Sequence, residues 1–423
     1  MPVDEVRAIQ AARRAAQDPD AEPKQRRALS HVGGKVAVEQ GEPALAKLLE
    51  RALDVRVSEE RVLADLHGFH SYPARMHPDT AHTLIEGLSR RGEHILDPFC
   101  GSGTILVEAQ RLERFPIGSD LNPLAVELAS LKTARLGSVF MRSLEAAADD
   151  VAEHARERQL AKLGPTMAYG PEDRELFASH ILLELDGLRS GIEELRDPGM
   201  ARALRLVLSA MLTKVSLKTG DSTQRTAPKR LARGYAIRFF KQKAHDLAVR
   251  ALEAREKTPR GAHKAEIEVA DARDLRYAEA RSVSLVVTSP PYPGVYDYYD
   301  HHELRLRWLR LDGRALSRNE IGARRAARRG PASVGEWERD FTRCLEECRR
   351  VLRRDGKAVF LVADSSLSGR AMRVDEWMPR LAARAKLSLV ARASQHRPHF
   401  HEGSARAFAG KPRREHLIIL KSE

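Results

Sequence analysis

The sequence predicts an α/β fold, in which a mostly parallel sheet of seven strands carries helices on both faces and is interrupted by a helical insertion. Three observations support this. A short apolar strand from His94 runs through a loop with two glycines into an amphipathic helix that continues to Ala109. A second short strand, 116–120, ends in an acidic residue, and strands alternate with helices again between 265 and 421. Such alternation is typical of doubly wound parallel sheets.

The chain divides into four parts. Residues 1–60 are rich in Ala, Arg, Glu and Gln, and we expect a helical or partly disordered N-terminal segment there. Residues 61–136 form the first half of the sheet domain and 264–423 the second half. Residues 137–263 have a helical pattern without strands, and an insertion of this length is too long for a loop, so we expect it to carry its own core.

Seven segments have strand character. The first begins at His94, and the other six occupy 116–120, 265–269, 283–288, 357–362, 388–393 and 415–421. Helices are expected at 78–89, 124–136, 337–352 and 377–385 around the sheet, and at 176–195 and 200–217 in the insertion. Ligands of open α/β sheets bind at the carboxyl ends of strands, so the residues that end these strands are candidates for a site.

The glycine loop, residues 98–103, indicates a nucleoside-type ligand. Gly101 and Gly103 let the backbone approach a ligand closely, and N–H groups at the start of the next helix favour an anionic group such as a carboxylate. The second strand ends at Asp120, about where a doubly wound sheet places a ribose-binding carboxylate. Leucine stands at position 106, where a dinucleotide-binding loop has a third glycine, so a nicotinamide or flavin cofactor fits less well.

The Pro-Pro turn, residues 289–292, follows a β-branched strand and reads Ser-Pro-Pro-Tyr. Two prolines fix two φ angles and remove two backbone donors, so carbonyl oxygens at the strand end are held outward as acceptors. This arrangement suits the exocyclic amine of a flat base. The carbonyl and hydroxyl oxygens can accept the hydrogens of the amine while the phenol ring stacks on the base. The pattern favours methyl transfer to such an amine.

The net charge of +13 suggests a polyanionic partner. Residues 212–260 hold thirteen Lys or Arg against four acids, and 305–329 hold nine Arg against two. Because these two patches together exceed the net charge, the rest of the chain is slightly acidic. We expect the first patch to contact nucleic acid, with the segment 305–329 and its preceding tyrosines as the alternative. The expected nucleic-acid-binding residues are Lys229, Arg230, Arg233, Arg238, Lys241 and Lys243.

Three cysteines in 423 residues, and no apolar stretch approaching a membrane span, favour a cytoplasmic protein without disulfides or a membrane anchor. Cys344 and Cys348 have helical spacing but no second Cys or His pair nearby, so we expect buried helix positions and no metal site. Cys100 in the glycine loop is expected to serve packing.

Several segments resemble the DNA amino-methyltransferases, which use S-adenosylmethionine to methylate cytosine N4 or adenine N6. Residues 97–104 (DPFCGSGT) resemble the cofactor loop of that family, 120–123 (DLNP) its ribose-binding turn, and 289–292 (SPPY) its catalytic motif. Residues 67–78 are similar to a segment that, in one branch of the family, closes over the methionine end of the cofactor. The resemblance covers about 66–136 and 264–423. It implies a Rossmann-like seven-stranded methyltransferase sheet, S-adenosylmethionine as cofactor and DNA as partner.

The resemblance also implies roles for individual residues. Asp97 would bind the amino group of the cofactor or offset its sulfonium charge, Asp120 would accept hydrogen bonds from the ribose, and Asp271 from adenine N6. Ser289 and the Pro290 carbonyl would hold the target amine. The expected cofactor-binding residues are Tyr72, Pro73, Asp97, Phe99, Gly101, Gly103, Thr104, Asp120, Leu121, Asn122, Asp271 and Ala272, and the expected catalytic residues are Ser289, Pro290, Pro291 and Tyr292.

Alternatives stay open at this point. Serine rather than aspartate at position 289 favours cytosine N4 within the family, with adenine N6 as the alternative. An RNA amino-methyltransferase, acting for instance on guanine N2 of tRNA, would share the glycine loop and a Pro-Pro-Tyr turn. A catalytically silent nucleic-acid-binding protein is the alternative of another class. The target sequence, the presence of a cognate restriction enzyme and the oligomeric state do not follow from the sequence.

Overall fold

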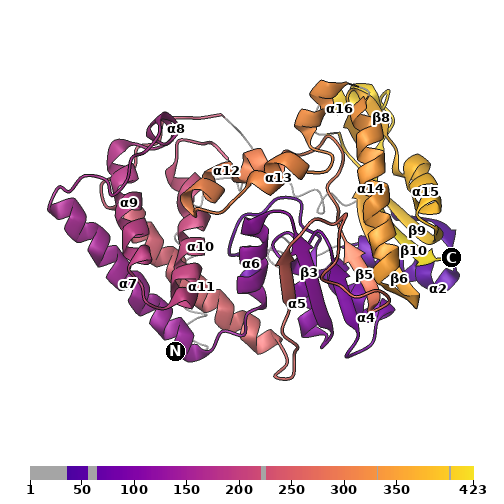
Figure 1. Ribbon diagram of the computed structural model, residues 1–423, viewed down its shortest axis with the longest axis horizontal. Coiled ribbons are helices and arrows are strands. Elements are labelled where there is room, and N and C mark those ends of the chain that lie inside the picture. The colour runs from indigo at the N-terminus through magenta and orange to yellow at the C-terminus, as the bar shows by residue number, and fades with distance from the viewer. Residues whose placement is uncertain (1–35, 56–63, 221–224, 331, 400–401) are drawn as a thin grey trace, which may run out of the picture.

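The computed structural model describes residues 36–55, 64–220, 225–330, 332–399 and 402–423. A twisted sheet with helices on both faces forms one side of the molecule, and a lobe of helices lies beside it (Figure 1). Helices α12 (Tyr298–Trp308) and α13 (Arg314–Asn319) run between these two parts at one end of the strands (Figure 1). The α/β class expected from the sequence is confirmed.

The main sheet has eight strands in the order β1-β9-β10-β6-β5-β2-β3-β4. The five strands from β6 to β4 are parallel, whereas β10 pairs antiparallel with both β6 and β9. All seven expected strands are present: β2 (His94–Asp97), β3 (Phe115–Asp120), β4 (Glu266–Val269), β5 (Val283–Thr288), β6 (Leu352–Ala363), β9 (Leu387–Arg397) and β10 (Arg413–Ser422). A separate hairpin, β7 (Ser365–Leu367) and β8 (Arg370–Met372), was not expected from the sequence.

The eighth strand, β1 (Val36–Gly41), corrects the expected count of seven. It lies in the segment for which we expected helix or disorder, and it pairs antiparallel with the edge strand β9. Its sequence, VAVEQG, is too short to predict a strand without a partner, and the partner lies more than 340 positions away in the chain. Helix α2 (Pro43–Leu53) follows it. The rest of the N-terminal segment, 1–35 and 56–60, lies outside the described residues.

The two faces of the sheet are covered by different helices. Helices α2, α4 (Pro78–Leu88) and α5 (Thr104–Arg111) pack on one face, and α14 (Ala332–Val351) and α15 (Val374–Arg384) on the other. Successive strand residues alternate between these cores: Val359 and Leu361 of β6 join the first, and Ala358 and Phe360 join the second. The central strands therefore read as continuous apolar runs because both faces are buried.

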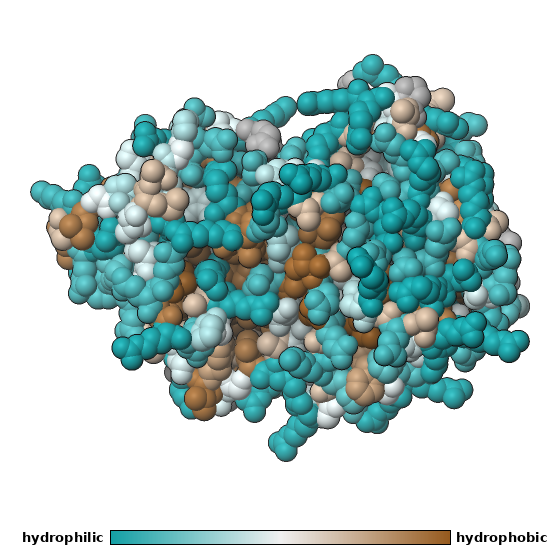
Figure 2. All heavy atoms as spheres, in the orientation of Figure 1, coloured by the Kyte–Doolittle hydropathy of each residue, from teal (hydrophilic) through white to brown (hydrophobic). Residues whose placement is uncertain are grey.

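The lobe consists of α7 (Ser138–Leu160), α8 (Pro171–Leu176), α9 (Ser179–Glu193), α10 (Pro198–Val215) and α11 (Tyr235–Lys257), which agrees with the helical insertion expected there. Its core is not separate, however. The same hydrophobic cluster includes α6 (Pro123–Thr133), the 3-10 helix η2 (Asp65–Gly68) and α12. Helix α6 is buried nearly all round, so it serves the sheet and the lobe together. Figure 2 shows hydrophobic residues grouped in the middle of this face, where the lobe meets the sheet domain.

The three cysteines and the helix lengths agree with what the sequence predicts. Cys100, Cys344 and Cys348 are buried and form no disulfide, and the last two lie on the side of α14 that faces the core. No helix within the described residues is both long and apolar enough to cross a bilayer. The remaining short elements are η3 (Arg324–Arg329) and α16 (Glu402–Ala407).

We predict that Gly103→Ala destabilises the protein by roughly 2 kcal/mol or more. Gly103 has a φ of +82°, and a Cβ there would lie 2.9 Å from the Cα and Cβ of Ala129 on α6. The matched control is Gly164→Ala, whose added Cβ would meet no atom within 4 Å. Denaturant unfolding of both variants provides the measurement, and equal stability of the two would contradict the packing argument.

Candidate active site

The carboxyl ends of β2 and β5 meet where the strand order reverses. Strands β3 and β4 lie on one side of β2, and β5 and β6 on the other. At this switch point, Thr288 Oγ1 of β5 donates a 2.7 Å hydrogen bond to Oδ1 of Asp97 on β2, and both residues are buried. This bond joins positions 191 residues apart and fixes the glycine loop against the Pro-Pro turn.

Asp97 is held in a low-dielectric environment. Burial raises its pKa to about 7, although the hydrogen bonds from Thr288 and from the Phe99 N–H oppose this change. Both hydrogen bonds use Oδ1, so the second oxygen is not needed to hold the strand ends together. Asp97 lines a small cavity of about 310 Å³ next to the glycine loop.

Asp120 ties the end of β3 to the glycine loop. Its Oδ2 accepts a 2.9 Å hydrogen bond from Gly101 N–H, and its Oδ1 accepts one of 2.9 Å from Asn122 N–H. Burial raises the pKa of Asp120 to about 6, while the backbone donors lower it. The carboxyl group lines a larger, open pocket of about 650 Å³ and has lone pairs left to accept from a ligand.

The two loop glycines have different uses. Gly101 lines both cavities with a φ of +48°, and a Cβ there would lie 3.1 Å from the Tyr72 ring, as expected for a residue that must approach other groups closely. Gly103 lines neither cavity, and its place in the cofactor-binding set stays a prediction. It is required instead because α5 packs tightly against Ala129.

Most of the predicted site residues surround these two cavities. Between them they combine apolar surface, a carboxylate, backbone amides and a serine hydroxyl, which suits a nucleoside. The larger pocket is lined by the predicted residues Tyr72, Pro73, Phe99, Gly101, Asp120, Leu121, Asn122, Asp271, Ala272, Ser289 and Pro291. The smaller cavity is lined by Tyr72, Asp97, Phe99, Gly101, Thr104 and Ser289.

Asp271, which follows β4, lies at the larger pocket but is engaged within the protein. Its oxygens accept from the backbone N–H, Nε and Nη2 of Arg273, at 2.9, 2.9 and 2.6 Å. Arg273 is also paired with Asp340 on α14 at 2.8 Å. The carboxylate is therefore oriented by a fixed guanidinium group, and a ligand would meet its remaining lone pairs.

The Pro-Pro turn is divided between the pocket and the interior. Ser289 lines both cavities and Pro291 the larger one, but Pro290 and Tyr292 line neither. The Tyr292 hydroxyl donates to Oε1 of Glu415 at 3.4 Å, and its ring packs against the core beneath α14. Glu415 is buried and is held in turn by Arg397 through its other oxygen.

A covering segment, residues 65–77, closes one side of the site. Its Tyr72 lies over Gly101, stacks on His302 of α12 at 4.8 Å between ring centres, and has its hydroxyl 3.4 Å from the Asn122 amide nitrogen. Through Tyr72, the covering segment therefore contacts the glycine loop, the turn 120–123 and α12.

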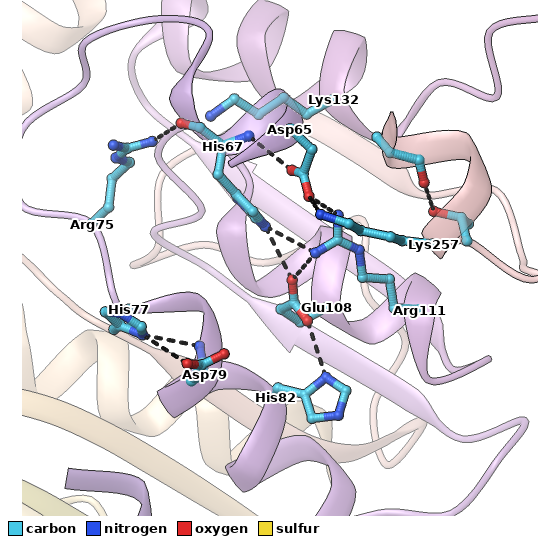
Figure 3. Close-up of polar contacts among 12 residues, drawn as sticks. Asp65, His67, Arg75, His77, Asp79, His82, Glu108, Arg111, Lys132 and Lys257 are labelled. Atoms are coloured by element: carbon cyan, nitrogen blue, oxygen red, sulfur yellow. Dashed lines mark hydrogen bonds and ion pairs between the residues drawn. The ribbon is translucent and has the colours of Figure 1, made fainter. Parts of the chain in front are cut away.

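Buried charges anchor this segment (Figure 3). Glu108 of α5 is bonded to the ring nitrogens of His67 and His82, each at 3.0 Å, and to Arg111 at 2.6 Å. Burial opposes ionisation of Glu108, but the hydrogen bonds from the two histidines hold its pKa well below the ordinary value. The carboxylate is therefore the fixed negative centre to which the covering segment is bound.

Asp65 extends this network to the lobe. It pairs with Arg111 at 2.8 Å and with Lys257 at the end of α11 at 3.0 Å (Figure 3). Arg250 of the same helix donates to the Asp65 carbonyl at 2.9 Å. The position of the covering segment thus depends on the lobe as well as on the sheet.

Sequence reasoning missed one wall of the larger pocket. This wall comes from the chain after the Pro-Pro turn, and its residues are Tyr298, Leu316, Asn319, Glu320 and Ile321. Glu320 accepts from the N–H of Tyr298 at 2.5 Å and from Arg325 at 2.7 Å, which holds the wall together. The tyrosine run around position 298 was a signal for part of this wall, but no sequence pattern places 316–321 beside the glycine loop.

The six predicted nucleic-acid-binding residues fall into two groups. Three are engaged within the protein: Lys229 Nζ donates to carbonyls at the end of α10, Lys241 pairs with Asp149, and Lys243 pairs with Asp246. Arg230, Arg233 and Arg238 are exposed, and none of them forms an ion pair with a described residue. Only this second group offers its charge to a partner directly.

The alternative segment, 305–329, is largely neutralised. Arg305 is buried and donates to Thr213 Oγ1 at 3.1 Å, Arg307 pairs with Asp173, and Arg325 pairs with Glu320. Arg310, Arg314, Arg324 and Arg329 also have acidic partners. Much of the positive charge counted along this sequence is therefore offset within the protein.

Comparisons with known proteins agree with this site. A family model described as DNA methylase matches residues 22–131. The Type II methyltransferase M.MjaII of Methanocaldococcus jannaschii is 32% identical over 76 residues, which cover 18% of this chain and 14% of that protein. The Type II methyltransferase M.MvaI of Kocuria varians is 42% identical over 72 residues, which cover 16% of this chain and 15% of that protein. The chain thus spans about a seventh of the length of these relatives.

Among solved structures, the rRNA methyltransferase aviRa of Streptomyces viridochromogenes is 14% identical, with 87% of this chain and 94% of that chain covered. Its TM-score of 0.34 is too low to bear on fold or substrate. The family match, by contrast, contains the glycine loop, Asp97 and Asp120. Residues 22–131 of this chain are thus similar to the DNA methylases, and short stretches of it are similar to two Type II methyltransferases.

Proposed function

We propose that this protein methylates an exocyclic amino group of a DNA base, with S-adenosylmethionine as cofactor and cytosine N4 as the favoured atom. One observation carries the proposal: Gly101 of the glycine loop and Ser289 of the Pro-Pro turn line the same two cavities. The family match and the two methyltransferase relatives support the cofactor and the substrate class.

The residues around the larger pocket fit the nucleoside part of the cofactor. The pocket combines apolar surface with a few polar groups, as small-molecule sites do. Asp120, already fixed by Gly101 N–H and Asn122 N–H, would accept from ribose hydroxyls, and Phe99 and Leu121 supply apolar surface. Bound S-adenosylmethionine supplies the methyl group.

The Pro-Pro turn would hold the other reactant. Ser289 Oγ and the Pro290 carbonyl are acceptors for the two hydrogens of the target amine, and their alignment would free the nitrogen lone pair for direct displacement. Tyr292 lines neither cavity, so it would stack on the base only through the part of its ring that the core beneath α14 leaves uncovered, while Glu415 fixes its hydroxyl. Serine at position 289 supports cytosine N4 over adenine N6. The proposal also includes a cognate restriction enzyme as partner.

The deciding experiment incubates the protein with duplex DNA, or separately with total tRNA, and methyl-labelled cofactor. Digestion to nucleosides and mass spectrometry should detect N4-methylcytosine in DNA only. Ser289→Ala should lower turnover by roughly 100-fold because an amine acceptor is lost, while cofactor binding stays intact. Ser282→Ala, which changes a serine just before β5, is the control. Label in tRNA alone would refute the assignment to DNA.

Cofactor affinity should depend on pH. The ordinary pKa of an Asp is 3.8, but that of Asp120 is raised to about 6, so the carboxylate gains its proton as the pH falls through 6 and loses acceptor strength. Affinity measured by calorimetry should drop roughly tenfold between pH 7.5 and 5. Asp120→Asn should bind weakly throughout.

Asp97 also titrates in this range, with a pKa of about 7. Asp97→Asn removes that contribution and should keep the fall that centres on pH 6. A flat profile in this variant would show that Asp120 does not contact the cofactor.

The exposed arginines at the start of α11 are proposed as the main DNA contact. Arg230, Arg233 and Arg238 present charge that no described acid offsets. Each phosphate contact contributes about 0.9 to the slope of log affinity against log salt. A triple Arg230/Arg233/Arg238→Ala variant should therefore bind duplex DNA more weakly, with the slope reduced by up to roughly 3.

The matched control removes the same charge elsewhere. Arg91, Arg156 and Arg276 are exposed but pair with Glu113, Glu153 and Asp274. Their triple alanine variant should keep the wild-type salt slope in fluorescence-anisotropy titrations. If both triple variants lose the same slope, net charge rather than this surface governs binding.

A further inference from the structure

Three exposed arginines form what we call the basic strip. Arg318 of α13 and Arg328 of η3 are the two arginines of the segment 305–329 that are exposed and form no ion pair with a described residue. Arg370, the first residue of β8 in the hairpin β7–β8, is a third exposed arginine of this kind. The charge of these three residues is available to a partner, unlike that of the six arginines in the same segment that pair with acids.

Hydrogen bonds join the three segments that carry the strip. Arg325 of η3 donates from Nη2 to the carbonyl of Ser317, the residue before Arg318, at 2.8 Å. In the hairpin, Ser368 Oγ donates to the carbonyl of Gly330 at 3.1 Å, two residues after η3 position 328. Helix α13, η3 and the hairpin are therefore bonded in sequence, and the strip has a fixed shape.

The strip lies at the edge of the sheet where the site is. Strand β6 is parallel to β5, so the hairpin that follows β6 lies at the same edge as the Pro-Pro turn that follows β5. Gly294, two residues past this turn, packs so closely on the Ser366 carbonyl of β7 that no Cβ fits between them. Asn319, next to Arg318, lines the larger pocket. The strip thus begins at the rim of that pocket and continues past the Pro-Pro turn.

Acids near the strip are already engaged by other arginines. The carboxylate of Glu338 interacts with Arg370, but both of its oxygens accept from Arg380, at 2.6 and 2.9 Å. Asp312, which interacts with the strip at α13, is bonded to Arg314 through both oxygens. The strip therefore keeps an excess of positive charge at the protein surface.

The exposed arginines before α11 lie on the lobe at the same end of the molecule. Their segment is held to the start of α9 by a 2.9 Å hydrogen bond between His180 Nε2 and the Leu231 carbonyl. Helix α8, just before α9, is joined to α12 by the pair of Asp173 and Arg307. Helix α8 and strand β8 lie on either side of α12 and α13 (Figure 1). Positive charge is therefore offered on both sides of these two helices.

We propose that the basic strip binds backbone phosphates of the DNA, and that one duplex crosses α12 and α13 between the strip and the exposed arginines before α11. This inference rests on the proposed function and adds to it the path of the duplex over the site. Cations held at fixed positions along a surface match the regular row of phosphates on a nucleic-acid backbone. Since Asn319 stands beside the strip, the larger pocket opens toward the duplex on this path.

The test measures the binding of a fluorescent duplex at several salt concentrations. An Arg318/Arg328/Arg370→Ala variant should bind more weakly, with the slope of log affinity against log salt reduced by up to roughly 3. The corresponding triple lysine variant should keep the wild-type slope, because each site retains its charge. When the strip substitutions are combined with Arg230/Arg233/Arg238→Ala, the two reductions should add, and the wild type should bind one duplex per chain.

The matched control removes three unpaired cations from the opposite edge of the sheet. Arg260 and Lys264 precede β4, and Arg354 lies near the start of β6; all three are exposed and form no ion pair with a described residue. Their triple alanine variant should keep the wild-type slope, and calorimetry should show unchanged cofactor affinity in both triple variants.

The inference fails if the strip variant keeps the full slope, or if the control loses as much slope as the strip variant. Two duplexes bound per chain would also overturn the single path. If the wild type binds no duplex DNA at all, the proposed function itself is refuted, and this outcome is distinct from the others.

Discussion

The buried hydrogen bond between Thr288 and Asp97 is the interaction on which the site depends. It crosses the switch point of the sheet, where chain segments separated by 191 residues come together. Both partners are excluded from water, so losing either would leave a buried polar group without its partner. Because β2 leads into the glycine loop and β5 into the Pro-Pro turn, this single contact sets the distance between the group that cradles a cofactor and the group that would hold a base.

The lobe is part of this arrangement rather than an attachment to it. Its core continues through α6 into the sheet domain, and Lys257 and Arg250 of α11 hold Asp65 of the covering segment. A charged network of this kind is stabilising only when every member has its partner. The segment that covers the glycine loop is therefore anchored to the part of the molecule that carries the exposed arginines.

Charge counted along the sequence and charge offered to solvent differ in this protein. Nine arginines between 305 and 329 suggested a basic surface, but six of them pair with acids: Arg307 and Arg310 with Asp173 and Glu193 of the lobe, and the other four with acids of the stretch 297–336. One of them, Arg325, holds Glu320 in the wall of the larger pocket. Just before α11, by contrast, Arg230 and Arg233 are exposed to solvent. The neighbouring Lys229 donates its hydrogen bonds to backbone carbonyls.

Seven of the strands, the glycine loop and the Pro-Pro turn could be predicted from local sequence, because hydrophobic period, glycine and proline act over a few residues. Local sequence placed Asp97, Asp120 and Ser289 at one edge for the same reason. Tertiary structure alone decided what pairs across long separations: strand β1 on the edge of β9, Gly103 against Ala129, Tyr292 toward Glu415, and the pocket wall after the turn. These features are contacts between residues far apart in the chain. A single sequence does not show which distant residues pack against each other.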